Sequence, residues 1–183
     1  MKKSIFLALV FLALTTGYAK AQSFDVGTNV ISAGIGLGST LDGYGYNSST
    51  PGFSVQYDRG IWEAGPGVIS LGGYLGFKGY KYSNANFQEK WNYTIVGARG
   101  AYHFTGLDVE NLDVYGGLML SINNVNFSYH AYDGSAYNGG SYGSDLGLSP
   151  FVGAKYYLSG NLAAYGELGF GVDVLNIGLA YKF

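Results

Sequence analysis

The sequence predicts an all-β protein, an eight-stranded antiparallel up-and-down transmembrane β-barrel that follows a cleaved signal peptide. Three observations lead to this fold class. The first residues have the pattern of a secretory signal, eight later runs alternate between apolar and polar residues, and the last run ends the chain on Phe183. In a transmembrane barrel one face of each strand meets lipid, the other meets a polar interior, and closure of the sheet removes its open edges.

Residues 1–21 form the predicted signal peptide. Lys2 and Lys3 supply the positive charge, residues 5–14 the apolar stretch, and Ala19-Lys20-Ala21 the small-residue cleavage pattern. The apolar stretch is too short for a membrane helix, and no Cys follows it to carry a lipid anchor. We therefore expect export and a mature domain, the barrel, over residues 22–183.

The composition fits strands joined by turns. The chain has 31 Gly, 18 Tyr, three Pro and no Cys, so stability cannot come from disulfides. The mature part keeps seven basic and twelve acidic residues, a net charge of −5, which favours no nucleic-acid partner. The apolar residues are periodic, which argues against a disordered Gly/Tyr/Ser chain. No metal-ligand cluster or phosphate-binding glycine motif is present, so we expect no metal and no cofactor.

Eight runs of period two, separated by clusters of Gly, Asn, Asp and Ser, are the predicted strands. In the first, Ile31, Ala33, Ile35 and Leu37 face away from Ser32, Gly34 and Gly36. In chain order the runs are Val30–Leu37, Phe53–Asp58, Ile69–Lys78, Ile95–Phe104, Val114–Asn123, Leu148–Leu158, Leu162–Phe170 and Asn176–Phe183. The last run should pair with the first and close the barrel.

The position of charge along these runs favours a membrane barrel. The apolar face of all eight runs lacks Asp, Glu, Lys and Arg, and the charged residues fall on the other face: Asp58, Lys78, Arg99, Lys155, Glu167 and Lys182. A water-soluble sandwich or lipocalin-like barrel would turn the charged face outward, and periodicity alone does not separate the two cases. The small residues on the charged face, the even strand number and the final Phe183 favour the membrane barrel, whose narrow interior must hold those charges.

Aromatic residues and connections give an orientation. We expect lipid-facing aromatic girdles at a lower rim (Tyr57, Tyr102, Phe104, Tyr156, Tyr181 and Phe183) and at an upper rim (Tyr80, Trp91, Tyr93, Phe127 and Phe170). Both termini should be periplasmic. The predicted outer loops are Gly38–Thr50, Ser83–Lys90, Ala131–Asp145 and Gly171–Asp173, and the inner connections are Arg59–Gly67, Thr105–Leu112 and Ser159–Asn161.

The ending Ile177-x-Leu179-x-Tyr181-x-Phe183 looks like the C-terminal signal read by the barrel assembly machinery. With the signal peptide and the eight runs, the chain resembles the small bacterial outer-membrane β-barrel superfamily, which includes the OmpA transmembrane domain, OmpX and OmpW-like proteins and the porin-family outer membrane protein beta-barrel domain. The resemblance implies the bacterial outer membrane as location. It also implies the assembly machinery, outer-membrane lipids and lipopolysaccharide as partners, and a monomer.

The predicted interior holds a network of charged and polar groups. Buried charges require partners, so we expect Arg99, Glu167 and Lys155 to associate, with Gln56 and Tyr115 as neutral partners. Asp58 should lie near Lys182 at the periplasmic mouth, and Lys78 also faces the lumen. Such a network fits a polar plug, or a gate for ions if its ion pairs can open.

For function, the sequence predicts a structural or surface-interaction protein and not an enzyme. Loops that mix Gly, Ser and Asn with Tyr suit adaptable binding surfaces. A narrow channel for small solutes, implied by the OmpW-like resemblance, is an alternative. A lipid-modifying enzyme is another, but it needs a base beside a nucleophile. The two imidazoles are His103, with no Ser partner in its own run, and His130, with Ser128 two residues before it.

Overall fold

The computed structural model describes residues 24–38, 48–107, 109–131 and 136–183. These residues form nine strands: β1 (Asn29–Leu37), β2 (Ser48–Ser49), β3 (Gly52–Glu63), β4 (Gly67–Ser83), β5 (Phe87–Phe104), β6 (Leu112–Ala131), β7 (Ala136–Tyr157), β8 (Leu162–Gly169) and β9 (Leu175–Lys182). No helix in the described ranges is long and apolar enough to cross a membrane. The predicted all-β fold class is confirmed.

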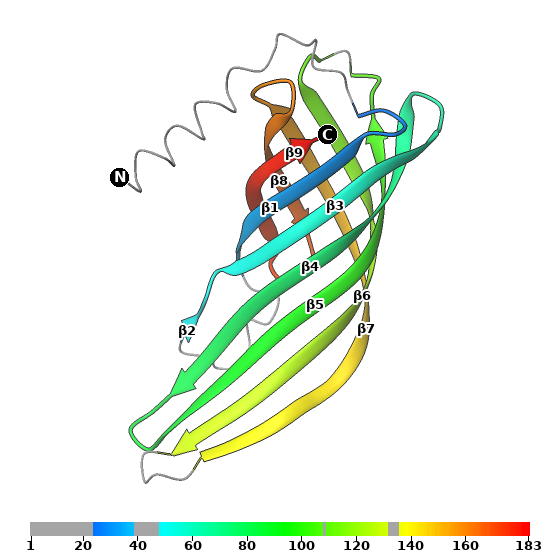
Figure 1. The fold of residues 1–183 in the computed structure, drawn as a ribbon. Coiled ribbons are helices and arrows are strands. Elements are labelled where there is room, and N and C mark those ends of the chain that lie inside the picture. The colour runs from blue at the N-terminus through cyan, green and yellow to red at the C-terminus, as the bar shows by residue number, and fades with distance from the viewer. Residues whose placement is uncertain (1–23, 39–47, 108, 132–135) are drawn as a thin grey trace.

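Eight of these strands close into one antiparallel barrel (Figure 1). Each pairs with its neighbours along the chain, β4 pairs with β5, and β1 pairs with β9 across the junction of the two ends. Strand β2 is outside this count, because it adds only two residues to the edge of β4, opposite Tyr80 and Lys81. The eight predicted runs therefore correspond to the eight barrel strands.

The terminal strand closes the barrel as predicted. Its register with β1 runs from Val30 opposite Lys182 to Leu37 opposite Leu175. Beyond the strand end, the amide of Phe183 donates to the carbonyl of Asn29 at 2.9 Å. The two ends of the described chain thus lie together at one end of the barrel, which we name the terminal end.

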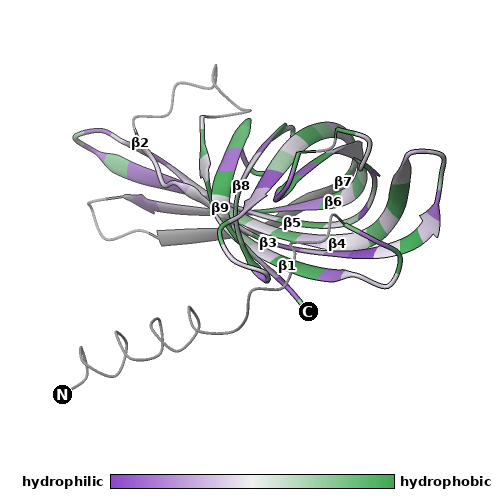
Figure 2. Cartoon of the chain, turned by 90° about the horizontal axis from the view of Figure 1, so that it is seen from above, coloured by the Kyte–Doolittle hydropathy of each residue, from purple (hydrophilic) through white to green (hydrophobic). Residues whose placement is uncertain are grey.

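The barrel is apolar outside and polar inside. On the outer face Leu118 and Leu120 are 55% and 56% exposed, whereas inside Arg99 is 3% and Lys155 0% exposed. Figure 2 shows the alternation of hydrophobic and hydrophilic residues along the strands. A water-soluble barrel would have the opposite arrangement, so the lipocalin-like alternative is wrong.

Strands β4 to β7 continue well past the others at the end opposite the termini (Figure 1). They have 17, 18, 20 and 22 residues, against nine in β1 and eight each in β8 and β9. Two predicted outer loops are therefore wrong, because β5 already begins at Phe87 and β7 at Ala136. Polar residues that indicated a loop, such as Gln88 and Lys90, lie within the longer β5. In the first predicted outer loop, residues 39–47 lie outside the described residues.

The turns are correspondingly short. Between β4 and β5 the side chain of Asn84 accepts hydrogen bonds from the amides of Asn86 and Phe87, at 2.9 and 3.0 Å, a local bond pattern that suits Asn to a turn. The predicted connection Arg59–Gly67 is also mostly strand, since β3 runs to Glu63 through an irregularity between Gly60 and Trp62.

In the prolonged part of β4 to β7 the outer face of the sheet is polar and the inner face aromatic, the reverse of the arrangement in the barrel. We name this part the extension sheet; it lies beyond the paired outer-face row Leu75, Val96, Ile122 and Leu146. Past this row the outer face of β5 and β6 carries Thr94, Asn92, Asn124 and Asn126, and the inner face carries aromatic residues. Tyr80, Trp91, Tyr93 and Phe127 were predicted in a lipid-facing girdle. That prediction is wrong, because Trp91 and Tyr93 share the strand face of buried Ile95 and Arg99.

The outer apolar belt can be tested with one strand. Leu118 lies on the outer face of β6, in the middle of the belt, and Leu118→Arg is expected to lower the free energy of unfolding in a bilayer by about 2–4 kcal/mol. Asn126→Arg, on the same strand and face but in the extension sheet, should change it by less than about 1 kcal/mol. Urea unfolding of both variants in lipid vesicles measures the difference. Equal effects of the two substitutions would contradict the assigned belt.

Candidate functional site: the barrel lumen and the extension sheet

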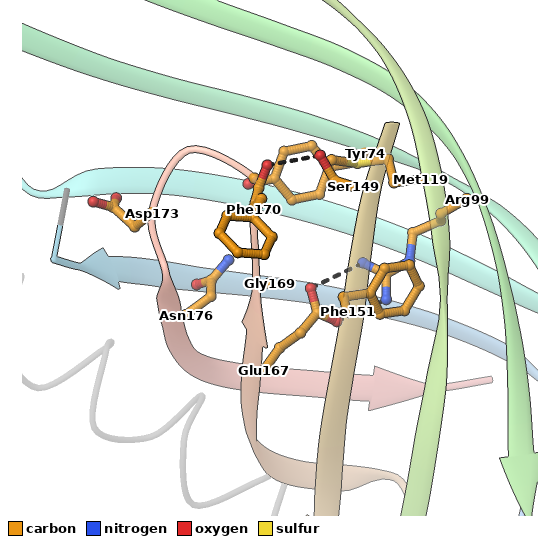
Figure 3. Close-up of a pocket in the computed structure, with 11 residues that line it drawn as sticks. Tyr74, Arg99, Met119, Ser149, Phe151, Glu167, Gly169, Phe170, Asp173 and Asn176 are labelled. Atoms are coloured by element: carbon orange, nitrogen blue, oxygen red, sulfur yellow. Dashed lines mark hydrogen bonds and ion pairs between the residues drawn. The ribbon is translucent and has the colours of Figure 1, made fainter. Parts of the chain in front are cut away.

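An ion-paired network occupies the centre of the lumen. Arg99 from β5 lies between Asp58 of β3, with Nε 3.1 Å from Oδ1, and Glu167 of β8, with Nη2 2.7 Å from Oε2. Gln56 and Tyr115 donate hydrogen bonds to the two Glu167 oxygens, at 3.1 and 3.0 Å. Figure 3 shows Arg99 and Glu167 approaching from opposite strands. The structure thus brings together Gln56, Arg99, Tyr115 and Glu167, and places Asp58, which was predicted at the mouth of the lumen, beside Arg99.

Lys155 continues the network toward the terminal end. Its ammonium is fully buried, 3.8 Å from a carboxylate oxygen of Asp58 and 3.8 Å from one of Asp113, and 3.7 Å from the centre of the Tyr115 ring. Asp58 and Lys182 both lie opposite Val30, on the two strands that flank β1, but the ion pairs of Asp58 are with Arg99 and Lys155. Lys182 instead lies over the ring of Tyr157, 4.5 Å from its centre.

A second group of residues in the lumen was not anticipated. His103 of β5 has its Nδ1 2.8 Å from Asp113 of β6 and its Nε2 3.0 Å from the hydroxyl of Ser70 of β4. All three side chains are buried. The run of His103 contains no Ser, and its Ser partner comes from the neighbouring strand β4. The alternation of Asp113 with Tyr115 is the signal that could have extended the fifth predicted run, Val114–Asn123, to include this carboxylate.

The terminal end of the lumen is filled by the first described residue. Phe24 is buried and stacks on the His103 ring, with centroids 3.6 Å apart and planes 6° from parallel. The turn that follows is fixed by Gly27, which adopts a φ of 87° and donates to the carbonyl of Gly60 at 2.9 Å. Because a side chain at position 27 would be strained at this φ, Gly27 lets the chain bend and direct Phe24 into the lumen.

The opposite end is filled by the short loop between β8 and β9. Asp173 is buried and forms an ion pair with Lys78, which also donates to the carbonyl of Gly38 at 2.6 Å. Burial raises the pKa of the Asp173 carboxyl, and the hydrogen bond from Lys78 opposes this effect. A Cβ at Gly36 of β1 or at Gly52 of β3 would collide with the Asp173 side chain. Glycine at these two positions therefore makes room for the loop.

Little space remains between these two ends. The lumen contains a cavity of about 10 Å³, enough for about one water molecule, lined by Tyr74, Arg99, Met119, Ser149, Phe151, Glu167, Gly169, Phe170, Gly171, Asp173 and Asn176 (Figure 3). Within the described ranges, His, Asp and Glu side chains form no group that could hold a metal ion. The described lumen residues around this cavity are joined by ion pairs and hydrogen bonds.

The inner face of the extension sheet is different. Trp91 and Phe127 lie side by side with ring centroids 5.1 Å apart, and Tyr80 meets Tyr93 edge to face at 5.3 Å. Trp91, Tyr93, Val125 and Phe127 line a second cavity of about 390 Å³. Rigid aromatic side chains provide much contact area at low entropic cost. This surface was not found from the sequence, since these rings were assigned to the lipid-facing side.

The remaining candidate residues lie on the outer face. Ile177, Leu179, Tyr181 and Phe183 are exposed there, between 45% and 63%. His130 also lies on the outer face, opposite Gln88, and Ser128 is on the same face of the same strand. Residues two apart on a strand have Cβ atoms about 7 Å apart, and the structure shows no hydrogen bond between the described side chains of Ser128 and His130.

Comparisons with known proteins identify the fold. No model of a known family matches the sequence, and no curated protein matches it. Among solved structures, the chain is similar to Ail, the attachment invasion locus protein of Yersinia pestis, in complex with the heparin analogue sucrose octasulfate. The identity is 17% over 86% of this chain and 99% of Ail, with a TM-score of 0.58. A structure of Ail without that compound gives 17% identity, the same coverage and a TM-score of 0.54.

Neisserial surface protein A is a more distant match, with 19% identity over 85% of this chain and 96% of that protein and a TM-score of 0.45. At these identities the comparisons establish architecture alone. The chain has the fold of Ail, a small closed antiparallel β-barrel.

Proposed function

We propose that this chain is an integral protein of the bacterial outer membrane, with its terminal end in the periplasm and its extension sheet outside the cell. The signal peptide pattern, the apolar belt and the fold shared with Ail support this location. The lipid-facing side chains of β9, ending at Phe183, suit a signal for the barrel assembly machinery. Outer-membrane lipids and lipopolysaccharide would surround a monomer.

We further propose that the lumen is a closed structural core and not a conduit. Arg99 and Glu167 cross the centre, Phe24 fills one end and Asp173 the other. The small size of the cavity between them, about 10 Å³, supports a closed lumen. A solute channel or an ion gate would require several of these contacts to separate together, so the closed core is the better supported reading.

The observation that carries the proposed function is the aromatic inner face of the extension sheet. This sheet continues beyond the apolar belt, so its length does not serve to cross the bilayer. Its inner face presents Trp91, Tyr93, Val125 and Phe127 around a cavity of about 390 Å³. Aromatic residues in such positions often dominate binding energies. We infer that the barrel is a membrane anchor and the extension sheet a surface for contact with molecules outside the cell.

We assign no catalytic role to Ser70, His103 and Asp113, although their contacts are in the order of a serine hydrolase triad. Ser70 and His103 are fully buried and Phe24 covers the imidazole. A nucleophile needs space for a carbonyl substrate beside it, and this packing leaves none. The three residues instead form a buried chain of hydrogen bonds, from Ser70 to His103 and from His103 to Asp113.

The closed lumen is tested by electrical recording. The wild-type protein in planar bilayers is expected to give no stable single-channel current. Glu167→Ala should lower the free energy of unfolding by about 3–5 kcal/mol, because Arg99 loses a buried counter-charge. The variant should still give no single-channel current, because both ends of the lumen remain filled. Glu167→Gln, which can still accept a hydrogen bond from Gln56, is the milder control. Steady wild-type currents would favour a channel, and currents confined to Glu167→Ala would favour a gate.

The surface-contact role is tested with the double variant Trp91→Ala/Phe127→Ala. Cells that display the protein should adhere to at least one of three coatings, heparin, collagen or cultured epithelial cells. The double variant should lose adhesion by about tenfold or more, since truncating central aromatic contacts costs about 2 kcal/mol or more. Phe104→Ala/Tyr156→Ala, which removes two outer-face rings near the terminal end, is the matched control. Equal adhesion of cells with and without the wild-type protein would refute this role.

If Ser70, His103 and Asp113 have only a structural role, Ser70 should not react as a nucleophile. A fluorophosphonate probe should label neither the wild-type protein nor Ser70→Ala in outer-membrane fractions. Ser70→Ala should cost about 1–3 kcal/mol of stability, because the buried Nε2 of His103 loses its partner and the contact with the Ala101 carbonyl is also lost. Labelling of the wild-type protein that disappears in Ser70→Ala would reveal an activity and overturn the assignment.

A further inference from the structure

The outer face of the extension sheet changes character in steps away from the belt. Strand register places side chains of β4, β5 and β6 next to one another in rows. After the apolar row come Phe77, Thr94 and Asn124, then Gly79, Asn92 and Asn126, and then Lys81, Lys90 and Ser128. The wall therefore passes from apolar, through neutral hydrogen-bonding groups, to a row with two positive charges.

Lys81 and Lys90 are direct cross-strand partners, and both are exposed. Residues in this relation have Cβ atoms about 4.5–5.5 Å apart, and like charges directly opposite each other destabilise a sheet. Their own face supplies no compensation: the outer-face residues described in these rows include no Asp or Glu. Glu89 precedes Lys90 in the chain but lies on the opposite, aromatic face. The pair is therefore a local positive site whose repulsion a bound anion would relieve.

The distance of Lys81 and Lys90 from the apolar belt indicates which kind of anion they can bind. Lys81 follows Phe77 by four residues, which is about 13 Å along the strand and about 9 Å along the membrane normal at a tilt of about 45°. This is the level of the polar headgroups, and a long Lys side chain can direct its ammonium toward them. Asn92 and Asn126 lie between the lysines and the belt, where their amides can donate further hydrogen bonds to phosphate oxygens.

We propose that Lys81 and Lys90 form a binding site for the phosphate groups of a phosphorylated glycolipid in the outer leaflet. The proposal rests on the outer-membrane location inferred above but not on the aromatic face, which lies on the other side of the sheet. Two adjacent ammonium groups can neutralise two neighbouring phosphates, a task that otherwise falls to a divalent cation. Binding should therefore persist when divalent cations are removed.

The test uses the purified, folded full-length mature protein and lipid A as the probe. In EDTA, the wild-type protein should bind detergent-dispersed diphosphoryl lipid A, and Lys81→Gln/Lys90→Gln should bind it about 30-fold more weakly, since each lysine near an anionic lipid surface contributes about fivefold. Lys81→Arg/Lys90→Arg should restore binding. Arg59→Gln removes an exposed positive charge near the terminal end and should leave binding unchanged.

The melting temperature with and without lipid A provides a second, independent test of the site. In phosphatidylcholine vesicles without lipid A, Lys81→Gln/Lys90→Gln should raise the melting temperature or leave it unchanged, because the repulsion is removed. In vesicles containing diphosphoryl lipid A the same variant should melt below the wild-type protein. This reversal shows that the variant folds and that the loss concerns the lipid.

Three results would overturn the proposal. Equal binding of diphosphoryl and fully dephosphorylated lipid A by the wild-type protein would exclude phosphate recognition. Competition by millimolar inorganic phosphate would assign the site to a free anion, and preferential capture of heparin would assign it to a soluble polyanion. Trp91→Ala/Phe127→Ala should bind lipid A normally, and cell fractionation tests the location separately, so failure of the proposed function can be told from failure of this site.

Discussion

The structure depends on the requirement that every backbone amide and carbonyl in an apolar surrounding finds a partner within the protein. An open sheet cannot meet this requirement at its edges, and the pairing of β1 with β9 meets it by leaving no edge. Closure of eight strands fixes a narrow interior. The alternation of side chains along each strand then determines which residues lie inside, because a strand that places Leu or Val on the outer face must place the residues between them in that interior.

The interior therefore resembles a small polar protein core. A charged side chain buried there is not solvated by bulk water and needs a counter-charge from another strand. Arg99 is ion-paired with Asp58 and Glu167, and Lys155 with Asp58 and Asp113. Such pairs add little net stability over apolar packing, but breaking one is costly. Their effect is to make the relative positions of β3, β5, β6, β7 and β8 mutually dependent. Glycines on the inner faces provide the room.

The sequence was sufficient for the strand number, the outer face and most lumen residues, because these follow from period-two alternation along single strands. It was insufficient wherever the answer depended on register between strands. Ser70 and His103 lie on different strands, as do the ion-paired Asp58 and Arg99, so the alternation along a single strand does not reveal these contacts. The extension sheet was missed for another reason. Outside the bilayer the outer face needs polar residues, so Gln88 and Lys90 were assigned to a loop although their strand begins at Phe87.

The junction of β1 and β9 also constrains the order in which the barrel forms. Neighbouring strands are joined by short turns, such as that at Asn84, whereas Asn29 and Phe183 are 154 residues apart in the chain. Loop-closure entropy and the dependence of folding rate on contact order imply that the local hairpins form first and this seam last. Until then the nascent sheet has two unpaired edges, and one of them is the strand that ends in Phe183. Once the seam forms, the backbone of that strand is hydrogen-bonded to β1 and is no longer open to pairing with another strand.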